Sequence, residues 1–220
     1  MSILLSLTLF AFEAKKSEPK YIASVVPKKM SVSAKKKRFY ALVVPAINKV
    51  YKELQEQFIT VSKDIKQGRN TKNIAELKRI YKVKSDKELL LALKPHPPSI
   101  ALAQAAIESS WGTSRFFTKA NNTFGIWSYS KNKPRIAAKE MRDGKKTIWL
   151  RKFNSIEDSI RAYYRMMGRA KAYKEFRKVR FESDDVFKII KKLNRYSELK
   201  EKYTVELAKI IRYNKLKKYD

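Results

Sequence analysis

The 220-residue chain is 44% hydrophobic, which suits one domain of moderate size, with or without an N-terminal extension. Its 51 Lys and Arg against 21 Asp and Glu give a formal charge of +30, which predicts an anionic partner: a nucleic acid, an anionic membrane or an acidic polymer. The absence of cysteine excludes disulfides and thiol-based sites. The only histidine, His96, stands among prolines and is interpreted as a loop residue, so a zinc site is not expected.

The N-terminus begins with an apolar run over residues 1–12. This run is too short to cross a bilayer, which needs about 20 residues, but it has the length of the hydrophobic region of a signal peptide. We therefore expect residues 1–14 to be a signal peptide that directs export; the alternative is a buried or frayed N-terminus. Residues 15–37, rich in Lys, Ser and Pro, are expected to form a basic linker.

Residues 38–94 are predicted to be a helical extension. From Arg38, apolar residues recur every three or four positions, which predicts a long helix that Pro45 should bend or restart. A short helix is expected over 73–81, and Ser85 followed by Glu88 is a capping-box signature that opens another helix. None of these helices carries a chemical signature, and we interpret them as a scaffold.

The most unusual stretch is Ala101–Gly112, which is almost free of charge in a chain that is 33% charged. Its first part, up to Glu108, is predicted to be a helix. We expect this helix to be buried, with Ser99 as its N-cap. It ends at Glu108, whose carboxylate should experience a low dielectric and therefore a raised pKa, as a general acid requires. The alternative is an ordinary glutamate at a helix end with its carboxylate in water.

A β-hairpin is predicted after this helix. The Asp143-Gly144 pair is a hairpin-turn signal between arms at 135–142 and 145–153, and Glu140 lies in the first arm. The rest of the chain reads as helices. The predicted fold class is α+β: a mostly helical domain with a small hairpin lobe.

Glu108 and Glu140 together suggest glycoside hydrolysis, in which one carboxyl group protonates the leaving oxygen and the other activates water or stabilises an oxocarbenium-like centre. Aromatic and amide side chains nearby could bind a sugar, although such residues also serve as core and turn residues. These candidates are Trp111, Trp127, Trp149, Asn121 and Asn122.

Four segments, in the right order, resemble the glycoside hydrolase family 73 β-N-acetylglucosaminidases. Ala103–Gly112 is similar to the catalytic helix of that family, and Asn122–Trp127 is similar to its Asn-x-Phe-Gly-Ile segment. Phe153–Tyr163 resembles a helix start of the family, and the turn at Tyr196 with Tyr203 resembles its C-terminal tyrosine region. The match covers about residues 38–216, and the form Trp-Gly-Thr-Ser-Arg-Phe resembles the Bax-like proteins of Gram-negative bacteria.

The resemblance implies a lysozyme-like domain over residues 95–220 and cleavage of the β-1,4 bond after N-acetylglucosamine in peptidoglycan. It maps Glu108 onto the catalytic acid, Glu140 onto the second glutamate, and Tyr196 onto the active-site tyrosine, with Tyr203 as the alternative. Tyr163 would pack behind the site. Asn122, Trp111, Trp127, Phe124 and Tyr203 would contact substrate. No metal or cofactor is implied, and the expected location is the periplasm.

Two other functions fit parts of the sequence. A cell-wall-binding module with an inactive site would keep the fold but release no new reducing ends. A nucleic-acid-binding protein would explain the charge, but the basic residues are scattered over nearly every helix instead of forming one recognition element, so we expect no nucleic-acid partner. The Lys-rich surface would instead favour association with an anionic membrane or wall polymer.

Overall fold

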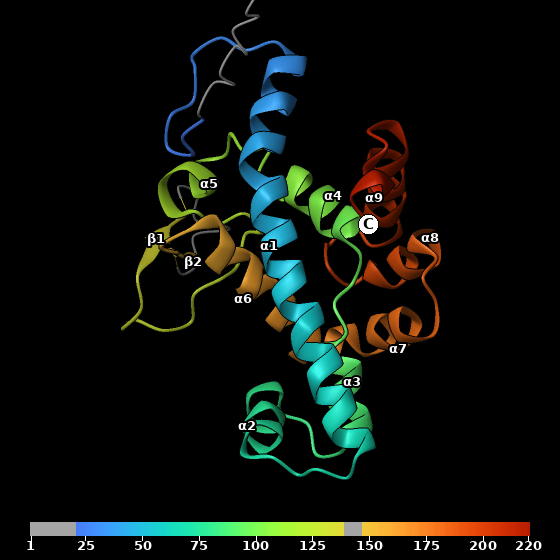
Figure 1. The fold of residues 1–220 in the computed structure, drawn as a ribbon. Coiled ribbons are helices and arrows are strands. Elements are labelled where there is room, and N and C mark those ends of the chain that lie inside the picture. Colours follow the sequence, from blue (N-terminus) through green and yellow to red (C-terminus); the bar gives the residue numbers. More distant parts are fainter. Residues whose placement is uncertain (1–20, 139–146) are drawn as a thin grey trace, which may run out of the picture.

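A computed structural model describes residues 21–138 and 147–220. This part of the chain is mostly helical, with one two-stranded sheet (Figure 1). The elements are α1 Val32–Lys66, α2 Lys72–Tyr81, α3 Asp86–Leu93, α4 Pro98–Glu108, α5 Arg115–Ala120, β1 Arg135–Ala137, β2 Trp149–Arg151, α6 Ile156–Arg169, η2 Lys171–Tyr173, α7 Lys174–Glu182, α8 Val186–Ile190, η3 Lys191–Leu193, α9 Glu201–Tyr213 and η4 Leu216–Tyr219. The predicted α+β class is confirmed.

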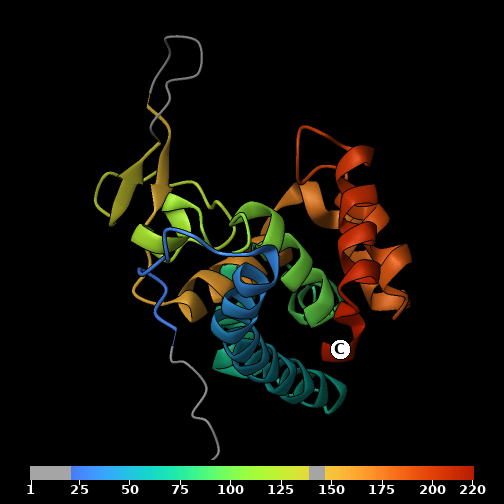
Figure 2. The ribbon, with the colours of Figure 1, turned by 90° about the horizontal axis from the view of Figure 1, so that it is seen from above.

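Helix α4 lies at the centre of the molecule, as its lack of charge predicts. Every residue from Pro98 to Ala106 is buried, and the helix packs against α1, α8, α9 and η4. In Figure 2 the β1–β2 lobe and helix α9 lie on opposite sides of α4. Small side chains such as those of Ala101 and Ala105 permit this enclosure, because they let neighbouring helices approach closely.

The N-terminus of α4 differs from the expectation. Ser99 is not the N-cap, because the helix begins at Pro98 with Pro97 as the cap residue. The oxygens of Asp220 perform the capping instead: Oδ1 accepts from the Ser99 amide and Oδ2 accepts from the Ser99 hydroxyl, both at 2.8 Å. A carboxylate is favourable there, because the helix dipole places partial positive charge at this end. No local sequence pattern indicates this contact, since 121 positions separate the two residues.

Helix α1 is one continuous helix from Val32 to Lys66 with Pro45 inside it, so the helix does not restart at Pro45. Proline removes one backbone hydrogen bond, but α1 packs against α3, α4 and α6 along its length, which offsets that loss. The helix also begins inside the segment expected to be a linker, where Ser31 caps it through the Ala34 amide. The expected signal peptide, residues 1–14, lies outside the described residues.

Two hydrophobic cores lie along α1. The larger surrounds α4 and includes residues of α1, α6, α8 and α9. The smaller one joins the C-terminal half of α1 to α2 and α3, through Val61, Leu77, Tyr81 and Leu89. The capping box predicted at Ser85 is present and opens α3. This second core fits a helical extension over 38–94, and the division into domains stays a prediction.

The predicted hairpin arms pair as an antiparallel sheet. Arg135 is opposite Arg151, and Ala137 is opposite Trp149. Trp127 adds an isolated bridge to Leu150, which joins the preceding loop to the sheet. The predicted turn and Glu140 lie outside the described residues.

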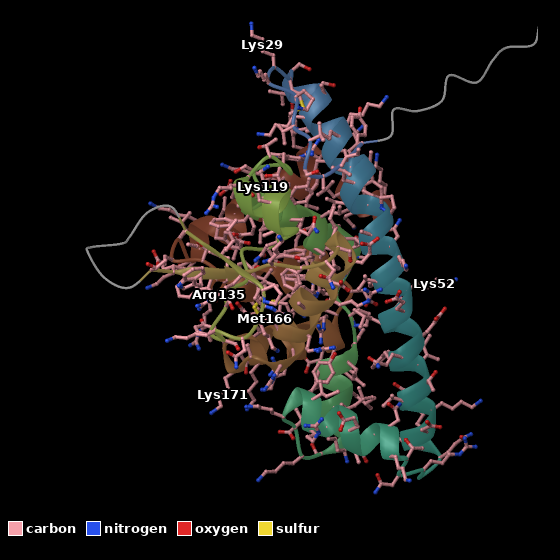
Figure 3. All side chains as sticks on the ribbon, turned by 90° about the vertical axis from the view of Figure 1, so that its left-hand side faces the viewer. Lys29, Lys52, Lys119, Arg135, Met166 and Lys171 are labelled. Atoms are coloured by element: carbon pink, nitrogen blue, oxygen red, sulfur yellow. The ribbon has the colours of Figure 1, made fainter. Side chains whose placement is uncertain are left out.

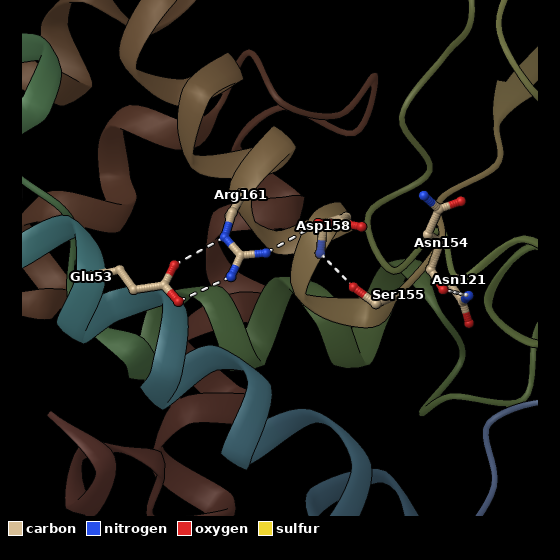
Figure 4. A network of polar contacts seen from close by, with 6 residues as sticks. All are labelled: Glu53, Asn121, Asn154, Ser155, Asp158 and Arg161. Carbon is tan, nitrogen blue, oxygen red and sulfur yellow. Dashed lines mark hydrogen bonds and ion pairs between the residues drawn. The ribbon is translucent and has the colours of Figure 1, made fainter.

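An ion pair joins the first helix to the sixth across more than a hundred positions of sequence. The guanidinium of Arg161 donates to both carboxylate oxygens of Glu53, at 2.9 and 3.0 Å, and to Asp158 at 3.1 Å (Figure 4). Ser155 caps α6, because its hydroxyl accepts a hydrogen bond from the Asp158 amide. These contacts fix the helix that forms one wall of the site described below. None of the described helices is both long and apolar enough to cross a membrane.

Candidate active site

The turn after α4 sets the position of Glu108. Three successive residues, Ser110, Trp111 and Gly112, have positive φ angles of 50°, 59° and 73°. This conformation costs roughly 1–2 kcal/mol for each residue with a side chain, so the surrounding contacts must stabilise it. The Ser109 hydroxyl accepts from the Gly112 amide at 2.8 Å, and the buried Arg38 guanidinium donates to the Gly112 carbonyl at 2.8 Å.

Glu108 itself is partly buried and lines a cleft with a volume of about 1060 Å³. The Tyr203 hydroxyl donates to Glu108 Oε1 at 3.1 Å. Burial raises the pKa of Glu108 and outweighs the Tyr203 hydrogen bond, which lowers it; the charge of Glu206 raises it further. The direction of this pKa shift and its cause, partial desolvation of the carboxyl group, agree with the expectation from the sequence.

The two candidate tyrosines lie beside each other. The rings of Tyr196 and Tyr203 are stacked with centroids 5.6 Å apart and an interplanar angle of 9°. Tyr203 is buried and contacts Glu108, whereas Tyr196 lines the cleft and donates to the Phe124 carbonyl at 3.4 Å. Burial raises the pKa of both phenols, so both stay neutral at physiological pH.

The other expected substrate residues divide into two groups. Phe124 and Trp127 line the cleft, and Trp127 is 50% exposed. Trp111 is not among the residues that line it: its ring packs edge-on against Phe39 and Tyr40. Asn122 is buried, and its amide group bonds to three backbone atoms, so it is a turn-forming residue, one of the two interpretations left open by the sequence.

A buried chain of hydrogen bonds continues from Tyr203 into the core. Gln104 Nε2 donates to the Tyr203 hydroxyl at 3.1 Å, and the Tyr163 hydroxyl donates to Gln104 Oε1 at 2.5 Å. The Tyr163 oxygen lies 2.9 Å from His96 Nε2. Tyr163 packs behind the site, stacked on Phe124 at 3.9 Å, as expected. His96 is indeed in a loop, but it is completely buried. The sequence shows Gln104 as the single amide in an apolar helix, but it does not show that Tyr163 and Tyr203 are its hydrogen-bond partners.

One wall of the cleft is strongly basic. It carries Arg165 and Arg169 of α6, Lys171 of η2, and Arg151 and Lys152 at the end of β2. Figure 3 looks onto this side, where Met166 lies between Arg135 of β1 and Lys171. The other cleft-lining carboxylate of the described residues, Asp158, is bonded to Arg161. Within the described ranges, no group of three or more His, Cys, Asp or Glu residues is arranged to bind a metal.

Comparison with known proteins decides the family. A family model described as mannosyl-glycoprotein endo-beta-N-acetylglucosaminidase matches residues 89–216, which is more than half of the chain. The chain belongs to this glucosaminidase family. It is therefore a glycoside hydrolase, and the resemblance drawn from the four sequence segments is confirmed.

This glucosaminidase is 36% identical to the exo-glucosaminidase LytG of Bacillus subtilis over 106 residues, which cover 46% of this chain and 38% of LytG. The chain therefore spans well under two thirds of that relative. Among solved structures, it superposes on the catalytic domain of the autolysin Auto from Listeria monocytogenes with a TM-score of 0.55 and 18% identity, covering 88% of this chain and 92% of that one. This likeness shows a shared lysozyme-like fold. A peptidoglycan hydrolase from Sphingomonas sp. A1 has a TM-score of 0.46 at 22% identity, with 66% and 85% covered.

Proposed function

We propose that this glucosaminidase is an endo-β-N-acetylglucosaminidase that cleaves the β-1,4 bond after N-acetylglucosamine in peptidoglycan. The observation that carries the proposal is Glu108: a partly buried carboxyl group with a raised pKa at the edge of an aromatic cleft. In its protonated form it can donate a proton to the glycosidic oxygen as the bond breaks. Trp127, which lines the cleft and is 50% exposed, gives it an apolar face on which a sugar ring can stack.

The second carboxylate of the reaction is assigned to Glu140. It lies outside the described residues, so the assignment rests on the resemblance of Glu140–Gly144 to the family hairpin. Asp158 is the weaker choice, because its carboxylate is already engaged in an ion pair with Arg161 at 3.1 Å. Whether the second group acts on water, on the sugar or through the substrate acetamide depends on its distance from Glu108.

The proposal is tested with purified peptidoglycan, Glu108→Gln and mass analysis of the products. We expect new reducing ends at N-acetylglucosamine for the wild type and a loss of at least about 100-fold for the variant, the usual contribution of a general acid. Fragments several disaccharides long would establish endo cleavage, whereas release of single terminal units would indicate the exo mode named for LytG. Circular dichroism controls for folding. Undiminished activity of the variant would contradict the assignment.

The alternative of an inactive cell-wall-binding module is separated by the same experiment, since a binder releases no reducing ends. The proposed substrate implies work in the cell envelope after export. Sequencing the N-terminus of the protein recovered from the periplasm would test whether residues 1–14 are removed.

A further inference from the structure

We propose that the basic wall of the cleft is a binding site for carboxylate groups of the peptides attached to the glycan substrate. This inference rests on the proposed function and concerns the same cleft. The site consists of Arg165 and Arg169 on α6 with Arg151 on β2, and its ligand is an acidic stem peptide adjacent to the sugar that Glu108 attacks.

Helix α6 presents one face to the cleft. Ala162, Arg165, Met166 and Arg169 recur at helical spacing and all line it. Arg165 and Arg169 are exposed, four positions apart on this face. A guanidinium group can donate two parallel hydrogen bonds to a carboxylate, so two arginines at this spacing suit a ligand with carboxylates along its length.

Arg165 and Arg169 differ from Arg161 in their ion pairs. Arg161, one turn earlier, has its charge compensated by Glu53 and Asp158. Arg165 and Arg169 make no ion pair with any carboxylate of the described residues, and the same holds for Arg151 on the same wall. All three arginines of α6 line the cleft, but only Arg161 has its charge compensated by carboxylates of the described residues.

Arg151 adds a second observation. Its guanidinium is partly buried over the Phe153 ring, with 4.6 Å to the centroid. Burial lowers the pKa of Arg151, and the nearby charge of Arg165 lowers it further. The two guanidinium charges therefore repel each other, and binding an anion at this wall would relieve that repulsion.

The cleft thus combines two chemistries. Near Glu108 it is aromatic, with Phe124, Tyr173 and Tyr196, and along α6 it is cationic. A neutral polysaccharide would use only the first surface. A glycan that carries acidic peptides would use both, since its sugar lies against the aromatic part while its carboxylates meet the guanidinium groups.

The experiment compares kcat/KM on intact peptidoglycan with kcat/KM on the same glycan after an amidase has removed its peptides. For the wild type we expect a preference for the intact substrate. In the double variant Arg165→Gln/Arg169→Gln the ratio of the two values should fall roughly tenfold, the factor associated with one charge-assisted hydrogen bond.

The matched control is Lys188→Gln/Lys192→Gln. These two exposed lysines are also four positions apart and do not line the cleft, so removing them changes the net charge equally. The control should keep the wild-type ratio. An unchanged ratio in the arginine variant, or an equal fall in the lysine variant, would overturn the inference. Failure of the wild type to cleave either substrate would instead count against the proposed function.

Discussion

At the scale of single residues, the chain of hydrogen bonds behind Glu108 has a fixed direction. The single hydroxyl hydrogen of Tyr163 is donated in the hydrogen bond to Gln104 Oε1, so His96 Nε2 must be the donor to the Tyr163 oxygen. His96 is then neutral and protonated at Nε2, in agreement with its lowered pKa, which follows from burial and from the charge of Arg180. Every donor in the chain points toward the carboxylate.

This arrangement predicts the effect of Tyr203→Phe on the pH profile. The variant removes the hydrogen bond that stabilises the charged form of Glu108, so the pKa of Glu108 should rise further. Because a general acid acts while protonated, activity is lost as pH rises through that pKa, and this limb of the kcat profile should move to higher pH.

A second variant, Tyr163→Phe, tests the chain itself. It keeps the ring stacked on Phe124 but leaves Gln104 Oε1 without its donor. If Gln104 orients Tyr203, the high-pH limb of the kcat profile should again move to higher pH. The double variant Tyr163→Phe/Tyr203→Phe should move it no further than Tyr203→Phe alone. A limb that stays in place while thermal stability falls would show that Tyr163 only supports packing.

The site residues differ in how far the sequence could predict them. Glu108 was predictable because its chemistry depends on its own helix, whose composition is local. The placement of Trp111 was not predictable, because the left-handed turn after α4 directs its ring toward α1. The same holds for the contact of Tyr203 with Glu108, since 95 positions of sequence separate the two.

At the scale of elements, the packing of α6 on α3 depends on Gly168. A methyl group there would lie 2.7 Å from the Ala92 carbonyl oxygen and 2.7 Å from Tyr81 Cε1. In an exposed helix, Gly→Ala stabilises by roughly 0.5–1 kcal/mol. Here we expect Gly168→Ala to destabilise by roughly 1–3 kcal/mol, the usual cost of overpacking. Urea unfolding measures the difference, and an increase in stability would contradict this close contact.

The start of a helix was predictable where the cap is local, as at Ser85. It was mispredicted where a distant residue acts, as at α4, which Asp220 caps. Pro45 illustrates the same rule for helix interiors. Its local penalty of about 3 kcal/mol would end an isolated helix, but α1 has buried core residues on both sides of that position, Val43 before it and Ala46 after it.

At the scale of the whole molecule, the formal charge of +30 acts over longer distances than the basic wall of the cleft does. An anionic wall polymer should therefore be attracted by the field of the entire surface. Salt screens this field, since the Debye length falls from about 10 Å at 0.1 M to about 3 Å at 1 M. We expect KM on intact sacculi to rise several-fold over that range, whereas kcat should change little, because the reacting groups are partly buried.

An uncharged chito-oligosaccharide is the control substrate, because its KM should be nearly independent of salt. The two double variants distinguish the long-range field of the whole surface from direct contacts in the cleft. Lys188→Gln/Lys192→Gln lowers the net charge by the same amount as the arginine pair but leaves the cleft intact. If only the long-range field mattered, both pairs would reduce the salt dependence equally. The arginine pair should reduce it more, because Arg165 and Arg169 contact the bound peptide as well as contributing to the field. Salt-independent cleavage of sacculi by the wild type would show that the charge neither attracts the wall polymer at long range nor binds its peptides in the cleft.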